Sequence, residues 1–302
     1  MARQRHKVVG LGEILWDMLP NGKQLGGAPS NFAYISALLG NEGIVASRVG
    51  NDLLGNEATH RLATLGVATG FVQRDVAHPT GAVRVTLDHA GQPKFEIAKD
   101  VAWDFLEWTS EWQTLASQAN AICFGSLAQR GATSRATIRQ FLTAVRKEAV
   151  LVLDVNLRQT FFSAEILAGS MKLADVVKLN DEELPRIMQL FGLDHREEIA
   201  SAHALMEVHH LHLICVTRGS RGSLLINRQG LHEHPGYRIQ VADTIGAGDA
   251  FTAGLVHEYM RGSSLSEMNE SANRLGAWVA SHTGAMPSPG KGGIQNELAR
   301  IG

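Results

Sequence analysis

Residues 243–256 read DTIGAGDAFTAGLV, a glycine-rich turn that runs directly into an apolar segment. From Ala247 to Met260 the chain is apolar on nearly every side, which predicts a helix buried in the centre of the fold. Gly246, Ala247 and Gly248 are small enough for their backbone N–H groups to approach an anion at the helix N-terminus. Asp249 would stand in the first turn. Its carboxylate either takes a proton from a hydroxyl that attacks a phosphate, or only stabilises the dipole of an ordinary helix start.

Short apolar runs alternate with helical patterns through most of the chain. Continuous apolar runs are typical of a parallel sheet that is covered by helices on both faces. These runs span residues 8–12, 44–49, 121–127, 151–156, 176–180 and 211–217. We expect one helix over residues 29–39 and another that Ser134 caps. The pattern predicts an α/β protein with a mostly parallel central sheet, as a single domain over residues 1–302.

Residues 80–98 depart from this pattern. Val83, Val85 and Leu87 alternate with polar residues, which predicts a half-exposed antiparallel strand. It would turn at residues 89–92 into a second strand. A small sheet of this kind suits a lid that excludes water from a reaction, and an edge hairpin of the main sheet is the alternative. We expect the lid to comprise segments near 13–20 and 72–98.

Composition excludes several classes of protein. The 302 residues carry a formal net charge of −2, whereas a general binder of nucleic acid or of a membrane surface would be basic. The chain has no run of about 18 apolar residues and its start lacks the apolar core of a secretory signal. We therefore expect a cytoplasmic protein. Cys123 and Cys215 lie in apolar stretches and are expected to be buried, reduced thiols.

A second glycine-rich stretch, GGAPSN at residues 26–31, opens the helix expected at 29–39. Gly27 allows close approach of a ligand, and the amide of Asn31 offers both donors and an acceptor to a polyol hydroxyl. Upstream, Glu13 and Asp17 supply carboxylate acceptors. A turn with an asparagine near a helix start would be the more ordinary interpretation of this stretch alone.

Two familiar nucleotide-binding signatures are missing. Residues 10–12 lack the third glycine of a dinucleotide fingerprint, and no G-x-x-x-x-G-K-[ST] motif occurs. Both a Rossmann oxidoreductase and a P-loop kinase are therefore disfavoured.

Taken together, GGAPSNFA (26–33) and DTIGAGDAFTAGLV (243–256) resemble the two signature motifs of the ribokinase-like (PfkB) carbohydrate kinases. The resemblance extends from GEILWD (12–17) to GAMPS (284–288) and is greatest to fructokinases. It implies a three-layer α/β/α ribokinase-like fold. It also implies transfer of the γ-phosphoryl group of ATP to a primary hydroxyl of a small sugar, with fructose as the leading substrate. The alternatives are a 2-keto-3-deoxygluconate, other ketose or nucleoside kinase, and a non-catalytic sugar-binding regulator.

The resemblance implies a role for each matching residue of the two motifs. Asp249 would be the catalytic base, and residues 246–248 would form an anion hole for the transferring phosphoryl group. Asp17, Gly27 and Asn31 would bind the sugar.

Other positions match the nucleotide and metal elements of the family. Asn180 and Glu183 match an N-x-x-E element that organises Mg²⁺, largely through waters. The positions assigned to ATP are Thr217, Gly219, Gly222 and Asn273.

Three further assignments complete the expected site. Arg158 follows the apolar run at 151–156 and is a candidate phosphate contact, or else a surface arginine paired with an acid. Asp243, Gly284 and Ser288 resemble a monovalent-cation site, which would bind K⁺. The expected partners are thus ATP and a small sugar, with no nucleic acid or membrane, and the protein would be a monomer or a homodimer.

Aromatic and histidine clusters complete the list of features. We expect Trp103, Trp108 and Trp112 to pack in the core, with one of them in reach of the sugar. His209, His210 and His212 suggest a metal site, but the segment supplies no neighbouring cysteine or carboxylate to complete it. A structural role is the stronger interpretation.

Overall fold

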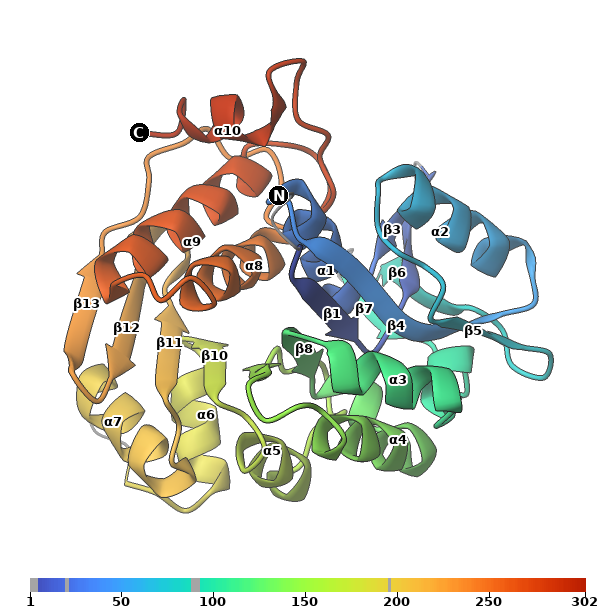
Figure 1. The fold of residues 1–302 in the computed structure, drawn as a ribbon, viewed down its shortest axis with the longest axis horizontal. Coiled ribbons are helices and arrows are strands. Elements are labelled where there is room, and N and C mark those ends of the chain that lie inside the picture. Colours follow the sequence, from blue (N-terminus) through green and yellow to red (C-terminus); the bar gives the residue numbers. More distant parts are fainter. Residues whose placement is uncertain (1–4, 20–21, 88–92, 195–196) are drawn as a thin grey trace.

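The structure, a computed structural model, describes residues 5–19, 22–87, 93–194 and 197–302. Its largest element is a nine-stranded sheet (Figure 1). In spatial order the strands are β13 (Gly230–His234), β12 (Ser223–Asn227), β11 (Leu213–Thr217), β10 (Val176–Asn180), β9 (Val150–Asp154), β8 (Ala121–Gly125), β1 (Lys7–Leu11), β4 (Glu42–Gly50) and β5 (Val72–Asp75). All pairs from β11 to β5 are parallel, and β12 and β13 extend the sheet in antiparallel fashion.

Helices cover both faces of this sheet and make three layers. On one face lie α1 (Ala28–Leu38), α2 (Leu53–Thr64), α8 (Ala247–Tyr259), α9 (Leu265–Ala280) and α10 (Gly293–Leu298). On the other face lie α3 (Ser110–Gln118), α4 (Ala132–Thr143), α5 (Ala164–Met171), α6 (Glu183–Leu190) and α7 (Glu198–His209). Each face buries its own hydrophobic cluster, so the predicted α/β/α architecture is confirmed. The helix α8 is central, as expected, with residues 250–256 all buried.

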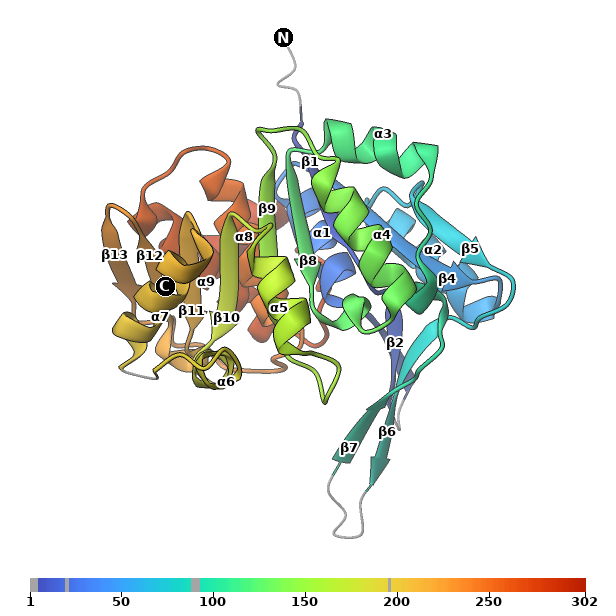
Figure 2. The same cartoon turned by 90° about the horizontal axis from the view of Figure 1, so that it is seen from below.

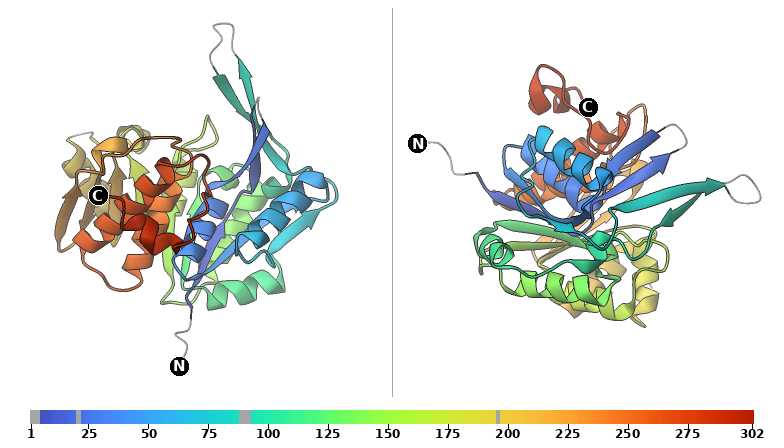
Figure 3. Two further views of the ribbon diagram at one scale, coloured as in Figure 1. Left: turned by 90° about the horizontal axis from the view of Figure 1, so that it is seen from above. Right: turned by 90° about the vertical axis from the view of Figure 1, so that its right-hand side faces the viewer.

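A second, four-stranded sheet projects from the end of the large sheet at which the parallel strands finish (Figures 2 and 3). Its strands are β3 (Gly22–Gly26), β2 (Leu15–Leu19), β6 (Gly81–Leu87) and β7 (Pro93–Ile97), in that order. The pairs β2–β3 and β6–β7 are antiparallel, whereas β2–β6 is parallel. The segment 72–98 is therefore divided, because β5 belongs to the large sheet. The turn expected at 89–92 lies outside the described residues.

Ser134 does not cap a helix, and that prediction is wrong. The helix α4 begins earlier, at Ala132, and Ser134 lies inside its first turn. The Ser134 hydroxyl donates to the carbonyl of Trp103 at 2.8 Å and accepts from the N–H of Leu106 at 2.8 Å. These bonds stabilise the 3-10 turn at Ala102–Phe105. Because the Ser134 hydroxyl is bonded to two buried backbone groups, it does not cap a helix.

The tryptophans, cysteines and histidines singled out in the sequence lie in the following surroundings. Trp103 and Trp112 are fully buried and Trp108 packs edge-on against Phe141, as expected for core residues. Cys123 and Cys215 are both buried and free, as expected. The histidines lie apart: His209 contacts Phe191, His210 ends α7 in a left-handed conformation, and His212 faces Asp175. In the described ranges, none of the helices has the length and apolar character that crossing a membrane requires.

Candidate active site

The two glycine-rich motifs meet at the carboxyl end of β1, although 218 positions separate Asn31 from Asp249. Asn31 lies in the first turn of α1 and Asp249 in the first turn of α8. Asn31 donates a hydrogen bond of 2.7 Å from Nδ2 to Oδ2 of Asp249. The N-termini of both helices thus point at one site, where their unpaired N–H groups favour negative charge.

Small residues at the start of α8 bring its backbone close to the rest of the site. Gly246 caps the helix with a left-handed φ of 78°, and a side chain there would collide with Ala285. A Cβ on Gly248 would lie 3.0 Å from Nζ of Lys178. The turn at 246–248 therefore has the compact form that the anion-hole hypothesis requires.

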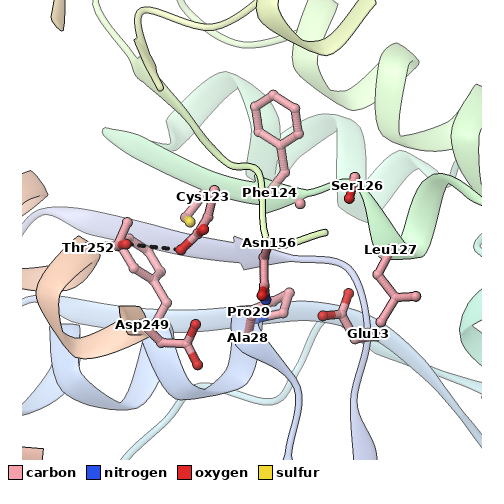
Figure 4. Close-up of a pocket in the computed structure, with 13 residues that line it drawn as sticks. Glu13, Ala28, Pro29, Cys123, Phe124, Ser126, Leu127, Asn156, Asp249 and Thr252 are labelled. Atoms are coloured by element: carbon pink, nitrogen blue, oxygen red, sulfur yellow. Dashed lines mark hydrogen bonds between the residues drawn. The ribbon is translucent and has the colours of Figure 1, made fainter. Parts of the chain in front are cut away.

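Glu13 and Asp249 line the same pocket (Figure 4), and their carboxyl groups lie on two sides of it with Asn156 between them. Burial raises the pKa of Asp249 to about 6 and the charge of Asp154 adds to this, while the Asn31 hydrogen bond lowers it. Burial likewise raises the pKa of Glu13 to about 7, with the charge of Asp249 contributing. A carboxylate with a pKa near 6 is ionised at neutral pH yet basic enough to accept a proton.

A buried ion pair lies beside this pocket, because its acid, Asp154, is one of the lining residues. Lys178 on β10 contacts both carboxylate oxygens of Asp154 at 3.1 and 3.2 Å, and Thr252 on α8 donates to Asp154 Oδ2 at 3.0 Å. Burial by itself would lower the pKa of Lys178, but Asp154, Glu183 and Asp249 together raise it above its ordinary value. The amine therefore carries its charge beneath Gly248. Sequence reasoning missed Lys178, and the only signal was one lysine within an otherwise apolar strand.

Arg158 lies in the loop after β9 and is exposed. Its carbonyl accepts the N–H of Phe161 at 3.0 Å, but its guanidinium has no hydrogen bond or ion pair within the described ranges. Its charge nevertheless lowers the pKa values of Glu13, Asp17 and Asp249. The described residues thus include no acid paired with Arg158, and its exposed guanidinium remains available to a ligand.

Asp17 lies on β2, directly opposite Gln24 of β3. Its Oδ2 lies 2.7 Å from the position of a Cβ on Gly26, so the carboxylate leans over the GG dipeptide. Burial raises the pKa of Asp17, and Arg158 opposes the shift. Gly27 has a φ of 104° and lies against the carbonyl of Glu13, where a side chain would not fit.

Asn180 and Glu183 are held by backbone groups. The Oδ1 atom of Asn180 accepts N–H groups of residues 182 and 183 at 3.0 and 2.8 Å. The carboxylate of Glu183 accepts the N–H of Leu157 at 2.7 Å and that of Asn180 at 2.9 Å. Because each carboxylate oxygen already has a partner, this donor set fits a Mg²⁺ ion that keeps its water shell. The described ranges contain no cluster of three or more His, Cys, Asp or Glu side chains placed to hold a metal.

The expected nucleotide element lies beside Asn180, because Thr217 pairs with that residue across β11 and β10. Gly219 and Gly222 have left-handed φ values of 58° and 81°, and a side chain on Gly222 would collide with the carbonyl of His234. Asn273 differs from these residues. Its Nδ2 donates to Ser223 Oγ at 2.8 Å and to Asn269, within a buried network between α9 and β12.

Two of the three residues assigned to a monovalent cation are in contact. Asp243 accepts the N–H of Gly284 at 3.1 Å through Oδ2 and that of Ile245 at 3.0 Å through Oδ1. Ser288 instead follows Pro287, whose carbonyl accepts a 2.7 Å hydrogen bond from the hydroxyl of Tyr34. Asp243 thus fastens the loop before α8 to the loop after α9.

Comparison with known proteins gives a consistent picture. The model of the pfkB family of carbohydrate kinases matches residues 21–291. A fructokinase of Escherichia coli is 32% identical over 93% of this chain and 95% of its own. The structure of a Pyrococcus horikoshii sugar kinase in complex with ATP superposes with a TM-score of 0.81, at 27% identity over 97% of this chain and 99% of its own. A Vibrio cholerae fructokinase with bound fructose, ADP and calcium has a TM-score of 0.78, at 26% identity over 94% of this chain and 95% of its own.

Proposed function

The chain belongs to the pfkB family of carbohydrate kinases, and from this premise we propose that it is a fructokinase with Asp249 as its base. It is an ATP-dependent sugar kinase, as the family and its ATP-bound relative indicate. Fructose as the acceptor is supported by the identity to the E. coli fructokinase and by the fructose in the V. cholerae structure. The hydrogen bond between Asn31 and Asp249 carries the proposal, because it joins a sugar-binding motif to a phosphate-binding one.

In the proposed reaction a primary hydroxyl of fructose attacks the γ-phosphorus of ATP. Asn31 hydrogen-bonds Oδ2 of Asp249, a residue that lines the pocket, and Oδ1 has no hydrogen-bond partner among the described residues. The hydroxyl proton passes to this carboxylate as the new O–P bond forms. The bond between the γ-phosphorus and the β–γ bridging oxygen breaks, and ADP leaves.

Charge stabilisation at the phosphoryl group comes from three sources. The N–H groups of residues 246–248 would face its oxygens, Lys178 adds a buried charge behind Gly248, and Arg158 supplies a second cation from the opposite loop. Hydrated Mg²⁺, held near Asn180 and Glu183, would neutralise the charge of the ATP phosphates. Thr217, Gly219 and Gly222 are proposed to line the nucleotide, with Asn273 supporting this region through its buried network.

The small sheet is proposed as the lid of a single domain, with Asp17 on its sugar-facing side. Closing it over the pocket would exclude water, which otherwise competes with the sugar for the γ-phosphoryl group. Asp243 and Gly284, with Ser288 farther along the same loop, are proposed as a K⁺ site that would hold the two loops flanking α8 and α9.

The test is ADP release from MgATP with fructose, glucose, ribose, tagatose, 2-keto-3-deoxygluconate and adenosine. Asp249→Asn is the matched control. We expect fructose to be preferred, and the variant to lose turnover by orders of magnitude while it still binds sugar and ATP. Preference for another acceptor would overturn fructose but keep the mechanism. Near-normal turnover by Asp249→Asn would remove Asp249 as the base, and sugar binding without turnover by the wild type would indicate a regulator.

A further inference from the structure

Arg130, between β8 and α4, joins two stretches of chain that lie apart in the sequence. Its side chain is only 7% exposed. Nε and Nη2 each donate a 2.7 Å hydrogen bond to the carboxylate of Asp104, and Nη2 also donates to the carbonyl of Ala98. Its Cζ lies 4.0 Å from the ring centroid of Trp103 and 4.6 Å from that of Phe161. One buried guanidinium thus contacts both residues 98–104 and the loop after β9.

The first of these stretches is the base of the small sheet. Ala98 directly follows β7, and its N–H donates to the carbonyl of Ala82 on β6 at 3.0 Å. Trp103 lies against Gly81, the first residue of β6, where a Cβ would be 2.2 Å from the indole Nε1. Arg130 is therefore attached where β6 and β7 leave the body of the molecule (Figure 2).

The second stretch is the loop that carries Arg158. The N–H of Phe161 donates to the carbonyl of Arg158 at 3.0 Å, so the two residues share one turn. Asn156 and Gln159, on either side of Arg158, have left-handed φ values of 40° and 49°. Residues other than glycine keep such conformations only where the surrounding contacts enforce them. The stacking of Phe161 on Arg130 is a contact of this kind.

The placement of the Arg158 side chain depends on this turn. Its guanidinium is exposed and has no hydrogen bond or ion pair among the described residues, so the backbone alone determines where it points. Its charge lowers the pKa of Asp17 on the small sheet and that of Asp249 at the start of α8. Arg158 thus lies within electrostatic reach of both sides of the proposed site.

We propose, on the basis of the kinase function above, that Arg130 is a positioning residue that couples the small sheet to Arg158 through the ring of Phe161. A guanidinium can bond a carboxylate and stack on aromatic rings at once, because it is planar and presents its donors in a fixed fork. A shift at the base of the lid is therefore transmitted to the turn at residues 158–161. Phosphoryl transfer is then fastest when the lid is seated and water is excluded.

The test measures kcat and KM for fructose and ATP in Phe161→Leu and Arg130→Lys. Phe161→Leu removes the ring but leaves the ion pair between Arg130 and Asp104 in place, and Arg130→Lys keeps the charge but loses the planar fork. Each variant should lower kcat about tenfold through misplacement of Arg158, with both KM values close to those of the wild type. Arg158→Met should itself lower kcat at least about tenfold, and adding either variant to it should cause no further loss.

The matched control is Arg274→Lys on α9. Arg274 also bonds a carboxylate, that of Glu270, and backbone carbonyls, and its Cζ lies 5.0 Å from the ring centroid of Tyr237. It has the same kinds of contact as Arg130 but none with the small sheet or the loop after β9 among the described residues. Its kcat should stay at the wild-type value even if its melting temperature falls.

Unchanged kcat in both Phe161→Leu and Arg130→Lys would overturn the proposal. Equal proportional losses with and without Arg158→Met would also overturn it, because Arg130 would then act through another group or through stability. A wild-type kcat in Arg158→Met would overturn it and remove Arg158 from the mechanism, without affecting the kinase function.

If no sugar is turned over, the proposed function fails instead, and hydrogen exchange of the Phe161 N–H then decides the inference. Faster exchange in Arg130→Lys than in the wild type and in Arg274→Lys supports the coupling of Arg130 to this turn. Equal exchange in all three proteins refutes it.

Discussion

Asn31 and Asp249 are joined by a 2.7 Å hydrogen bond that connects the first turns of α1 and α8. This bond orients the carboxylate, and it also lowers the Asp249 pKa against the effect of burial. The asparagine that we propose to bind the sugar therefore also tunes the proposed base.

Asn31→Leu should separate these two effects. Without the hydrogen bond, the pKa of Asp249 should rise above its value of about 6, so the acid limb of the kcat/KM profile should move to higher pH. At pH 8, kcat/KM for the sugar should fall at least about tenfold through the lost contact. Asn56→Leu, on the exposed side of α2, is the control. An acid limb at the same pH in Asn31→Leu would contradict the role of this bond.

Asp249→Asn should make the protein more stable near neutral pH. The folded-state pKa of Asp249 is raised from 3.8 to about 6, so folding disfavours the ionised form. The folded wild type consequently loses stability as the pH rises from about 4 through 6, by roughly 3 kcal/mol. The variant has no such loss. At pH 7.5 the urea midpoint of unfolding should be higher for the variant than for the wild type, and this difference should vanish near pH 4. Equal midpoints at pH 7.5 would show that burial does not penalise this charge.

Lys178→Met should destabilise the protein strongly. It leaves Asp154 buried with Thr252 as its remaining side-chain partner, and loss of one member of a buried ion pair costs about 3–5 kcal/mol. Urea unfolding measures this loss. Adding Asp154→Leu should restore part of the stability, because no unpaired charge then remains. A double variant that is less stable than Lys178→Met would mean that the unpaired charge of Asp154 is not the cause of the lost stability.

Sequence reasoning found the parts of the molecule that local patterns determine. The central strands are recognisable because burial on both faces makes them continuously apolar. The short strands β3 and β5 carry charged and polar residues at sheet edges and have no such pattern. Lys178 was missed for a different reason. Its partner Asp154 lies 24 positions away, and only the adjacency of β9 and β10 brings the two together.

Glu183→Gln should loosen the loop that carries Arg158. The carboxylate accepts the N–H groups of Leu157 and Asn180, and an amide can accept through one oxygen only. We expect a loss of about 1–2 kcal/mol in stability and faster hydrogen exchange in residues 155–160. Glu182→Gln, an exposed neighbour, should change neither. Unaltered exchange at Leu157 in Glu183→Gln would contradict this positioning role.

Gly10→Ala should affect stability and activity together. A Cβ on Gly10 would overlap the carbonyl oxygen of Pro29, because α1 lies directly on β1 at this point. Overpacking of this kind costs about 1–3 kcal/mol, or more when backbone must move. Since Asn31 follows Pro29 in the same helical turn, displacement of α1 would also misplace the hydrogen bond to Asp249. Gly70→Ala meets no atom within 4 Å and is the control. The melting temperature and kcat/KM should both fall in Gly10→Ala and stay unchanged in the control. A stable Gly10→Ala variant with normal kinetics would show that α1 can shift without disturbing the site.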